Sequence, residues 1–280
     1  MPIFSSYDGT ALWYDLVGAG RPLVALAGGP GADARYLGDL GGLPADRTVI
    51  RLHARATGRS AVPDGRAGCS FTEQWRDVEA LRAHLGLDAI DLLGHSAGAL
   101  TAQRYAAELP ARVRRLALVT PVGRSAREPQ DAELAAIRAS RSAEPWYPDA
   151  AAADRELRAG GDAAELSARI TPFFWGRWDE RARAEAFDPE LVPARPWIRE
   201  AFYAGAGEPE PVRVPVLVVA GALDGVIGTV PARLVAECHP DSRLEVLAGA
   251  GHRPWVDRPE EFRALLAGFL DGPEAVSAGR

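Results

Sequence analysis

The segment Gly94-His95-Ser96-Ala97-Gly98 constrains the fold of this chain more than any other stretch of its sequence. An apolar run at residues 89–93 precedes it, and a helix-like run at residues 99–108 follows it directly. Small residues on both sides of Ser96 permit a very tight strand-to-helix turn, which holds the serine hydroxyl clear of the backbone. The helix behind such a turn directs its free N–H groups and its positive end toward the same point. The alternative is a glycine-rich loop with a solvated serine, but the flanking strand and helix favour the turn.

Strand-like and helix-like segments alternate along most of the chain. Repeated alternation of this kind predicts an α/β fold with a mostly parallel central sheet and helices on both faces. Ser70 and Glu73 predict a capping box at the start of one helix. The predicted helices cover residues 70–85, 99–108 and the stretch from residue 259 onward. The predicted strands cover residues 10–17, 22–27, 47–52, 89–93, 115–120, 214–220 and 243–247.

Residues 121–213 break this alternation, because they are rich in alanine, arginine and acidic residues and contain no strand-like run. We predict that they form a helical lid inserted into a core made of residues 1–120 and 214–280. Most tryptophans of the lid are expected to pack it against the core. Trp175 and Trp178 are candidates for the wall of a substrate pocket, since lids of this kind cover the site. Residues 272–280 are expected to be a frayed tail.

Composition excludes several kinds of chemistry. All 32 basic residues are arginine, so a Schiff-base lysine, a Ser-Lys dyad and a phosphate-binding Walker loop are excluded. The net charge of −6 gives no electrostatic reason to expect nucleic acid binding. Cys69 and Cys238 lack the spacing of a metal site, and two free thiols are expected rather than a disulfide. With no ligand cluster and no dinucleotide-binding fingerprint, neither a metal nor a cofactor is expected.

The first residues, from Met1 to Asp8, have neither a positive start nor an apolar run, so no signal peptide is predicted. No apolar stretch approaches the length that crosses a bilayer. We therefore expect a cytoplasmic location, no membrane partner and a small-molecule substrate. The oligomeric state is left open by the sequence.

A serine hydroxyl needs a base, and His252 is the best candidate among the five histidines. It follows the last predicted strand, where α/β sheets build their sites. Structural roles are expected for His84 on a helix, for His95 on the underside of the turn and for His239 in a surface turn. Asp224 ends an apolar strand and is the candidate that orients the base, with a plain turn aspartate as the alternative.

A tetrahedral intermediate needs two N–H donors for its oxyanion. The backbone of Ala97, directly after Ser96, is expected to provide one. The glycine cluster at residues 28–31 is expected to provide the other, and Gly29 is the preferred candidate because glycine lets the backbone approach a carbonyl closely. The alternative is that this cluster is only a strand-to-loop turn.

At this point the chain resembles the α/β-hydrolase superfamily over nearly its whole length, since serine, aspartate and histidine follow in the same order. Residues 26–31, Leu-Ala-Gly-Gly-Pro-Gly, resemble the His-Gly-Gly-Pro-Gly loop of the proline iminopeptidase-like branch. That branch also carries Asp-x-Arg-Gly-x-Gly-x-Ser, which residues 53–60 match in part. The matches are Arg55, Gly58 and Ser60, and the departures are His53, Ala56, Ala27 for the loop histidine and Ala97 for the usual tryptophan.

The resemblance implies a cofactor-free serine hydrolase that cleaves an ester or amide of a small or peptide-like molecule through an acyl-enzyme. Aminopeptidases of the branch hold the substrate amine with lid carboxylates, and the sequence selects none of the acids here. The alternatives are acyl transfer, cyclisation or lyase chemistry on the same fold, as in natural-product tailoring, and a non-catalytic binding protein. The lid acids are Glu144, Asp179, Glu180 and Glu200, among others.

Overall fold

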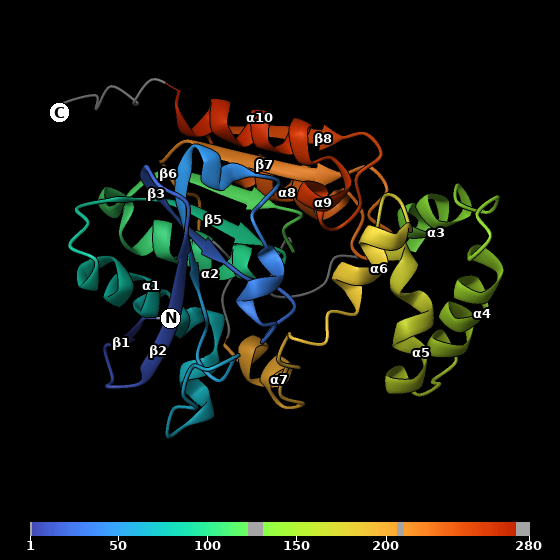
Figure 1. Ribbon diagram of the computed structural model, residues 1–280, viewed down its shortest axis with the longest axis horizontal. Coiled ribbons are helices and arrows are strands. Elements are labelled where there is room, and N and C mark those ends of the chain that lie inside the picture. The colour runs from blue at the N-terminus through green and yellow to red at the C-terminus, as the bar shows by residue number, and fades with distance from the viewer. Residues whose placement is uncertain (1, 123–130, 206–209, 273–280) are drawn as a thin grey trace.

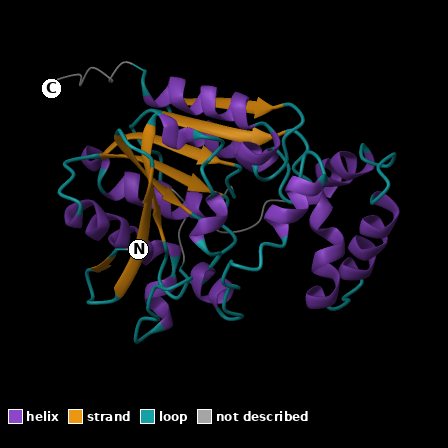
Figure 2. Ribbon diagram, in the orientation of Figure 1, coloured by secondary structure: helices purple, strands orange, loops and turns teal. Residues whose placement is uncertain are grey.

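The centre of the molecule is one eight-stranded sheet, shown in orange in Figure 2. A computed structural model describes residues 2–122, 131–205 and 210–272. The strand order is β1-β2-β4-β3-β5-β6-β7-β8, with β1 and β2 antiparallel to their neighbours and the other strands parallel. The strands are β1 (Ile3–Ser5), β2 (Ala11–Val17), β3 (Arg21–Leu26), β4 (Arg47–Leu52), β5 (Ile90–His95), β6 (Val113–Val119), β7 (Val216–Gly221) and β8 (Ser242–Leu247).

The burial of the strands follows from their place in the sheet. Every residue of β5 and of β7 is buried, because both strands lie inside the parallel part and are covered on two faces. The edge strand β8 has no buried residue. The predicted α/β fold with a mostly parallel sheet is therefore confirmed, including each strand that the apolar runs indicated.

Helices cover both faces of the sheet (Figure 1). On one face, α1 (Phe71–His84), α2 (Gly98–Glu108) and α8 (Val230–Cys238) contribute side chains to a large apolar cluster. On the other face, α9 (Pro254–Asp257) and α10 (Pro259–Leu270) contribute Trp255, Phe262 and Leu266 to a second cluster. The sheet therefore lies between two apolar layers.

The start of α1 differs from the predicted capping box. Ser70 does cap the helix, but its hydroxyl accepts from the N–H of Thr72, at 3.2 Å. The side chain of Glu73 pairs with Arg76 one turn later instead of turning back to the cap. An arginine three residues away competes for this carboxylate, which the capping pattern alone does not consider.

Between β6 and β7, the described residues form five α-helices, and residues 131–205 contain no strand. They are α3 (Asp131–Ala139), α4 (Tyr147–Arg158), α5 (Ala163–Ile170), α6 (Glu180–Ala186) and α7 (Ile198–Tyr203). Figure 1 shows α3, α4 and α5 at one end of the molecule, away from the sheet. Most of the predicted tail, residues 273–280, lies outside the described residues. No helix among the described residues is long and apolar enough to cross a membrane.

A buried ion pair ties α1 to the loop after β4. The side chains of Arg55 and Asp77 are 0% and 2% exposed, and Arg55 Nε donates to Asp77 Oδ2 at 2.8 Å. Arg55→Met leaves this carboxylate buried without its cation, so we expect the free energy of unfolding to fall by about 3–5 kcal/mol. Urea denaturation measures the change. Arg243→Met, which removes an exposed pair with Glu245, should leave the midpoint unchanged. Equal stability of Arg55→Met and the unaltered protein would contradict this expectation.

Candidate active site

Ser96 lies in the turn between β5 and α2, and the turn is as tight as the sequence predicted. Only Ser96 and Ala97 separate the strand from the helix. The φ angle of Ser96 is +51°, a left-handed conformation that costs energy for a residue with a side chain. Gly94 and Gly98 allow this turn, since an added Cβ would lie 2.7 Å from Ala99 Cα or 2.5 Å from the Ala27 carbonyl. Within the described part of the chain, the Ser96 hydroxyl makes no hydrogen bond.

His252 and Asp224 form a hydrogen-bonded pair between the loops that follow β8 and β7. Nδ1 of His252 lies 2.7 Å from Oδ2 of Asp224, whose side chain is fully buried. The other carboxylate oxygen accepts the N–H groups of Val226 and Ile227, at 2.9 and 3.1 Å. A carboxylate in this arrangement only accepts, so the proton of neutral His252 lies on Nδ1 and Nε2 is free to take a proton.

The His252 loop lies directly against the serine turn. The ring centroid of His252 is 4.9 Å from that of His95, the residue before Ser96. Its backbone carbonyl accepts from His95 Nε2 at 2.9 Å and from the Thr120 hydroxyl at 3.0 Å. The structure thus brings together the ends of β5, β7 and β8, as the sequence order predicted. The chemical roles of Ser96, Asp224 and His252 stay predictions.

The glycine loop after β3 also reaches the serine turn. An added Cβ on Gly28 would lie 2.6 Å from the Cβ of Ser96, so only glycine fits there. The N–H of Gly28 donates to the Tyr36 hydroxyl at 2.7 Å and is therefore occupied. By contrast, the N–H groups of Gly29 and Ala97 donate to no residue in the described ranges. Gly29 has a φ of +60°. These two groups are available to an oxyanion, and that role remains a prediction.

A cavity of about 30 Å³ lies beside the glycine loop. Its walls include residues 27–28 and 30–32, Thr101 of α2, and Ile198 and Phe202 of α7. This volume suits one water molecule or a group of similar size. Thr101 Oγ1 is buried without a hydrogen-bond partner among the described residues, so a polar group in the cavity would find a hydroxyl available. Helix α7 therefore forms part of the wall of this cavity, whose lining does not include Ser96, Asp224 or His252.

Trp175 and Trp178, the predicted pocket residues, lie together. Trp175 is only 1% exposed and packs in the cluster that contains Trp255 and Phe262. Trp178 lies beside it, with ring centroids 6.3 Å apart, and is partly buried. Neither residue lines the cavity at the glycine loop. Contact of these two rings with a substrate stays a prediction.

The other histidines take structural positions. Nε2 of His84 lies 3.3 Å from the Tyr14 hydroxyl. The prediction that His239 lies in a surface turn is wrong, because this residue is 2% exposed and bonds Gln103 of α2 at 3.0 Å. Burial lowers the pKa of His239. The following proline indicated a turn, but proline carries no information about which side of that turn packs inward.

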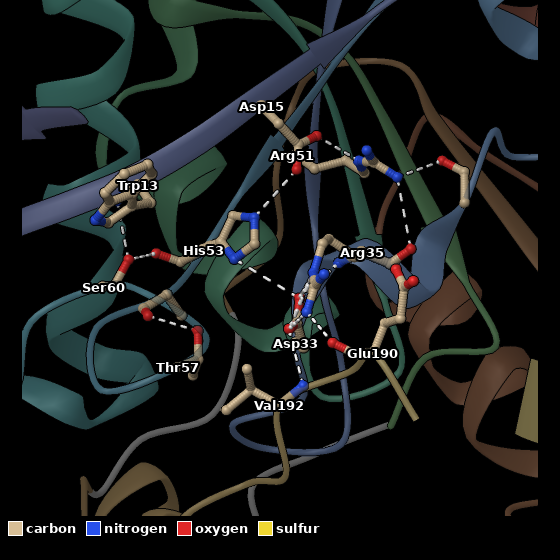
Figure 3. A network of polar contacts seen from close by, with 12 residues as sticks. Trp13, Asp15, Asp33, Arg35, Arg51, His53, Thr57, Ser60, Glu190 and Val192 are labelled. Carbon is tan, nitrogen blue, oxygen red and sulfur yellow. Dashed lines mark hydrogen bonds and ion pairs between the residues drawn. The ribbon is translucent and has the colours of Figure 1, made fainter. Parts of the chain in front are cut away.

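A polar network next to the glycine loop was not predicted (Figure 3). Asp33 accepts the N–H of Val192 at 3.1 Å and pairs with Arg35, which also donates to the Glu190 carbonyl. These contacts attach the segment before α7 to the loop after β3. His53 lies between two acids, 3.1 Å from Asp15 and 3.8 Å from Asp33. The only sequence signal was the position of Asp33 two residues after Gly31.

The Asp33 network predicts a loss of stability in acid. Burial opposes ionisation of Asp33, but hydrogen bonds from Arg35 and Val192 outweigh it and lower the pKa to about 2. A depressed pKa stabilises the fold above the ordinary value of 3.8 and stops doing so as the pH falls through 2. We expect Asp33→Asn to cost about 1–3 kcal/mol at pH 7 and only a small fraction of that at pH 2. Urea midpoints from pH 7 to pH 2 test this, and a constant difference over that range would refute it.

Both thiols are free in the structure, with Cys69 buried and Cys238 exposed. Among the described residues, no group of three or more histidine, cysteine, aspartate or glutamate side chains is placed to hold a metal ion.

Comparison with known protein families identifies the same fold. The family described as alpha/beta hydrolase fold matches residues 22–259. The chain belongs to the alpha/beta hydrolase family. The resemblance to its proline iminopeptidase-like branch is confirmed by similarity to a proline iminopeptidase from Lactobacillus delbrueckii subsp. bulgaricus. The two sequences are 26% identical over 89% of each chain.

The chain is also similar to proteins whose names describe other hydrolytic reactions. The chain is 30% identical to an N-formylmaleamate deformylase from Pseudomonas putida, over 91% of each sequence. Its structure resembles that of the esterase EaEST from Exiguobacterium antarcticum, with a TM-score of 0.74 and 21% identity. That match covers 96% of this chain and 99% of the esterase, and it supports the fold alone.

Proposed function

We propose that this alpha/beta hydrolase is a serine hydrolase that cleaves an ester or amide bond of a small or peptide-like molecule. The observation that carries the proposal is the 2.7 Å contact between His252 Nδ1 and Asp224 Oδ2, on loops that meet the strained Ser96 turn. A binding protein has no need for a histidine held by a buried carboxylate on a loop that packs against a strained serine turn. The hydrolase names of relatives such as the deformylase and the iminopeptidase support the reaction class.

In the proposed reaction, Oγ of Ser96 attacks the substrate carbonyl carbon while Nε2 of His252 takes the hydroxyl proton. Asp224 holds the His252 ring and stabilises the imidazolium that forms. The N–H groups of Gly29 and Ala97 donate to the oxyanion of the tetrahedral intermediate. The intermediate collapses to an acyl-enzyme as His252 returns the proton to the leaving alcohol or amine. Water then repeats these steps, releases the acid and restores Ser96.

We further propose that residues 121–213 form a lid that selects the substrate, with Trp175 and Trp178 in its wall. Two observations support this. Helix α7 contributes Ile198 and Phe202 to the cavity at the glycine loop. The segment that leads into α7 is held at Asp33, close behind that loop.

Labelling with a fluorophosphonate, followed by mass spectrometry of the peptides, tests the nucleophile. The expected result is one adduct, on Ser96. A panel of p-nitrophenyl esters and aminoacyl p-nitroanilides then separates esterase from aminopeptidase activity. A folded protein that is neither labelled nor active on either class would overturn the proposal in favour of a binding role. Transfer of the acyl group to an added alcohol or amine in preference to water would instead favour an acyltransferase.

A further inference from the structure

Two buried side chains, Tyr36 and His95, connect three loops of the candidate site. The Tyr36 hydroxyl accepts the Gly28 N–H at 2.7 Å and lies 2.5 Å from His95 Nδ1. His95 Nε2 lies 2.9 Å from the His252 carbonyl. This chain of hydrogen bonds therefore runs from the glycine loop, through the residue before Ser96, to the backbone of the proposed base.

The direction of each hydrogen bond follows from its acceptors. A backbone carbonyl only accepts, so His95 must carry its proton on Nε2. The unprotonated Nδ1 then accepts from the Tyr36 hydroxyl, whose oxygen is left to accept from Gly28. Burial, together with His252 nearby, lowers the pKa of His95 well below its ordinary value, so the ring stays neutral. Burial raises the pKa of Tyr36 to about 12, so its hydroxyl keeps its proton.

Aromatic packing holds both rings in place. The Trp255 ring meets His95 edge-on, with centroids 4.8 Å apart, and also lies 6.4 Å from Tyr36. The guanidinium of Arg253 lies over the Tyr36 ring, 4.6 Å from its centroid. Ala27, which stands where the related loops have histidine, has no polar group with which to fix the glycine loop. The Tyr36 hydroxyl provides that fixation from outside the loop.

We propose that Tyr36 and His95 are positioning residues, which keep the Gly29 N–H and the His252 ring at fixed positions relative to Ser96. The proposal rests on the proposed function, because it assigns these residues to the same reaction. Neither side chain needs to touch the substrate. Since displacement of reacting groups by about 1 Å can cost about 100-fold in rate, loss of the connection should be visible in turnover.

The test is Tyr36→Phe, which removes one hydroxyl and keeps the packed ring. We expect kcat on the best ester of the panel to fall by about 10- to 100-fold, with KM changed less than about two-fold. The matched control is Tyr14→Phe, which removes a buried hydroxyl that also contacts a histidine, His84, away from the site. This control should keep the activity of the unaltered protein. Equal kcat for Tyr36→Phe and the unaltered protein would overturn the proposal, as would equal losses in both variants.

Histidine NMR separates failure of this proposal from failure of the proposed function. Long-range ¹H–¹⁵N spectra of ¹⁵N-histidine protein report which ring nitrogen carries the proton. We expect the Nε2–H form for His95 and the Nδ1–H form for His252, whether or not a substrate is turned over. In Tyr36→Phe the Nδ1 resonance of His95 should shift, because its donor is lost. An inactive protein with these tautomers would refute only the hydrolase, whereas His95 in the Nδ1–H form would refute the connection itself.

Discussion

Ser96→Ala is expected to lower kcat for the best ester substrate by about 10⁵- to 10⁶-fold, the scale seen when a nucleophile that acts with its base is removed. Loss of activity should not come from loss of a hydrogen bond in the fold, because the Ser96 hydroxyl makes none among the described residues. Adduct formation with the fluorophosphonate should disappear in the same variant. Initial rates and intact-protein mass spectrometry measure the two effects.

The control for Ser96→Ala is Ser167→Ala, on the exposed surface of α5, which should be labelled and turn over substrate normally. Alanine at position 96 still has to adopt a φ near +51°, so the folded state of the variant must be checked by circular dichroism. Persistent labelling of a folded Ser96→Ala protein would show that another residue is the nucleophile.

The second large effect is expected for Asp224→Asn, with kcat lower by about 10⁴-fold. The carboxylate now accepts from His252 Nδ1 at 2.7 Å and from two backbone N–H groups. An asparagine amide that keeps its carbonyl oxygen on the backbone N–H groups presents its NH₂ to the ring. His252 then shifts its proton to Nε2 and can no longer accept one from Ser96. The change should therefore fall on kcat, with little effect on KM.

Two further measurements sharpen the Asp224→Asn prediction. Asp241→Asn, an exposed acid just before β8, should leave kcat unchanged and serves as the matched control. The histidine NMR experiment should report His252 in the Nε2–H form in Asp224→Asn. Full activity with unchanged tautomers would exclude Asp224 from the reaction.

Much of the architecture could be predicted because it depends on local patterns. The apolar runs that became β5 and β7 are uninterrupted, as strands buried on both faces require. The Ser96 turn could be predicted from its small neighbours, since the close approach at Gly94 and Gly98 tolerates no Cβ. Parallel strands end at one edge of the sheet, so the position of Asp224 in sequence was enough to place it near His252.

Contacts between segments distant in sequence could not be predicted. Tyr36 precedes His95 by 59 residues, and no pattern links a hydroxyl in one loop to an imidazole in another. The burial of His239 against Gln103 depends in the same way on where the residue that follows α8 meets α2. The sequence indicated His53 only as a departure from a family motif. Its position between Asp15 and Asp33 depends on how β2, β4 and the glycine loop pack together.

The three candidate residues and the helices before β7 lie in separate stretches of the chain, which bears on how such a protein can change over evolutionary time. Ser96, Asp224 and His252 lie on loops of the sheet, and none lies among helices α3 to α7. The stretch before β7 still touches these loops, because the Phe174 carbonyl accepts the His252 N–H at 2.6 Å and the Phe173 carbonyl accepts the Gly225 N–H at 3.0 Å. Substitutions in α4 and α5, away from these two contacts, can accumulate without moving the three side chains. Under the proposed function, a new range of substrates could arise from changes in these two helices while Ser96, Asp224 and His252 are kept. Chimeras that exchange α4 and α5 between relatives and keep residues 171–176 test this separation.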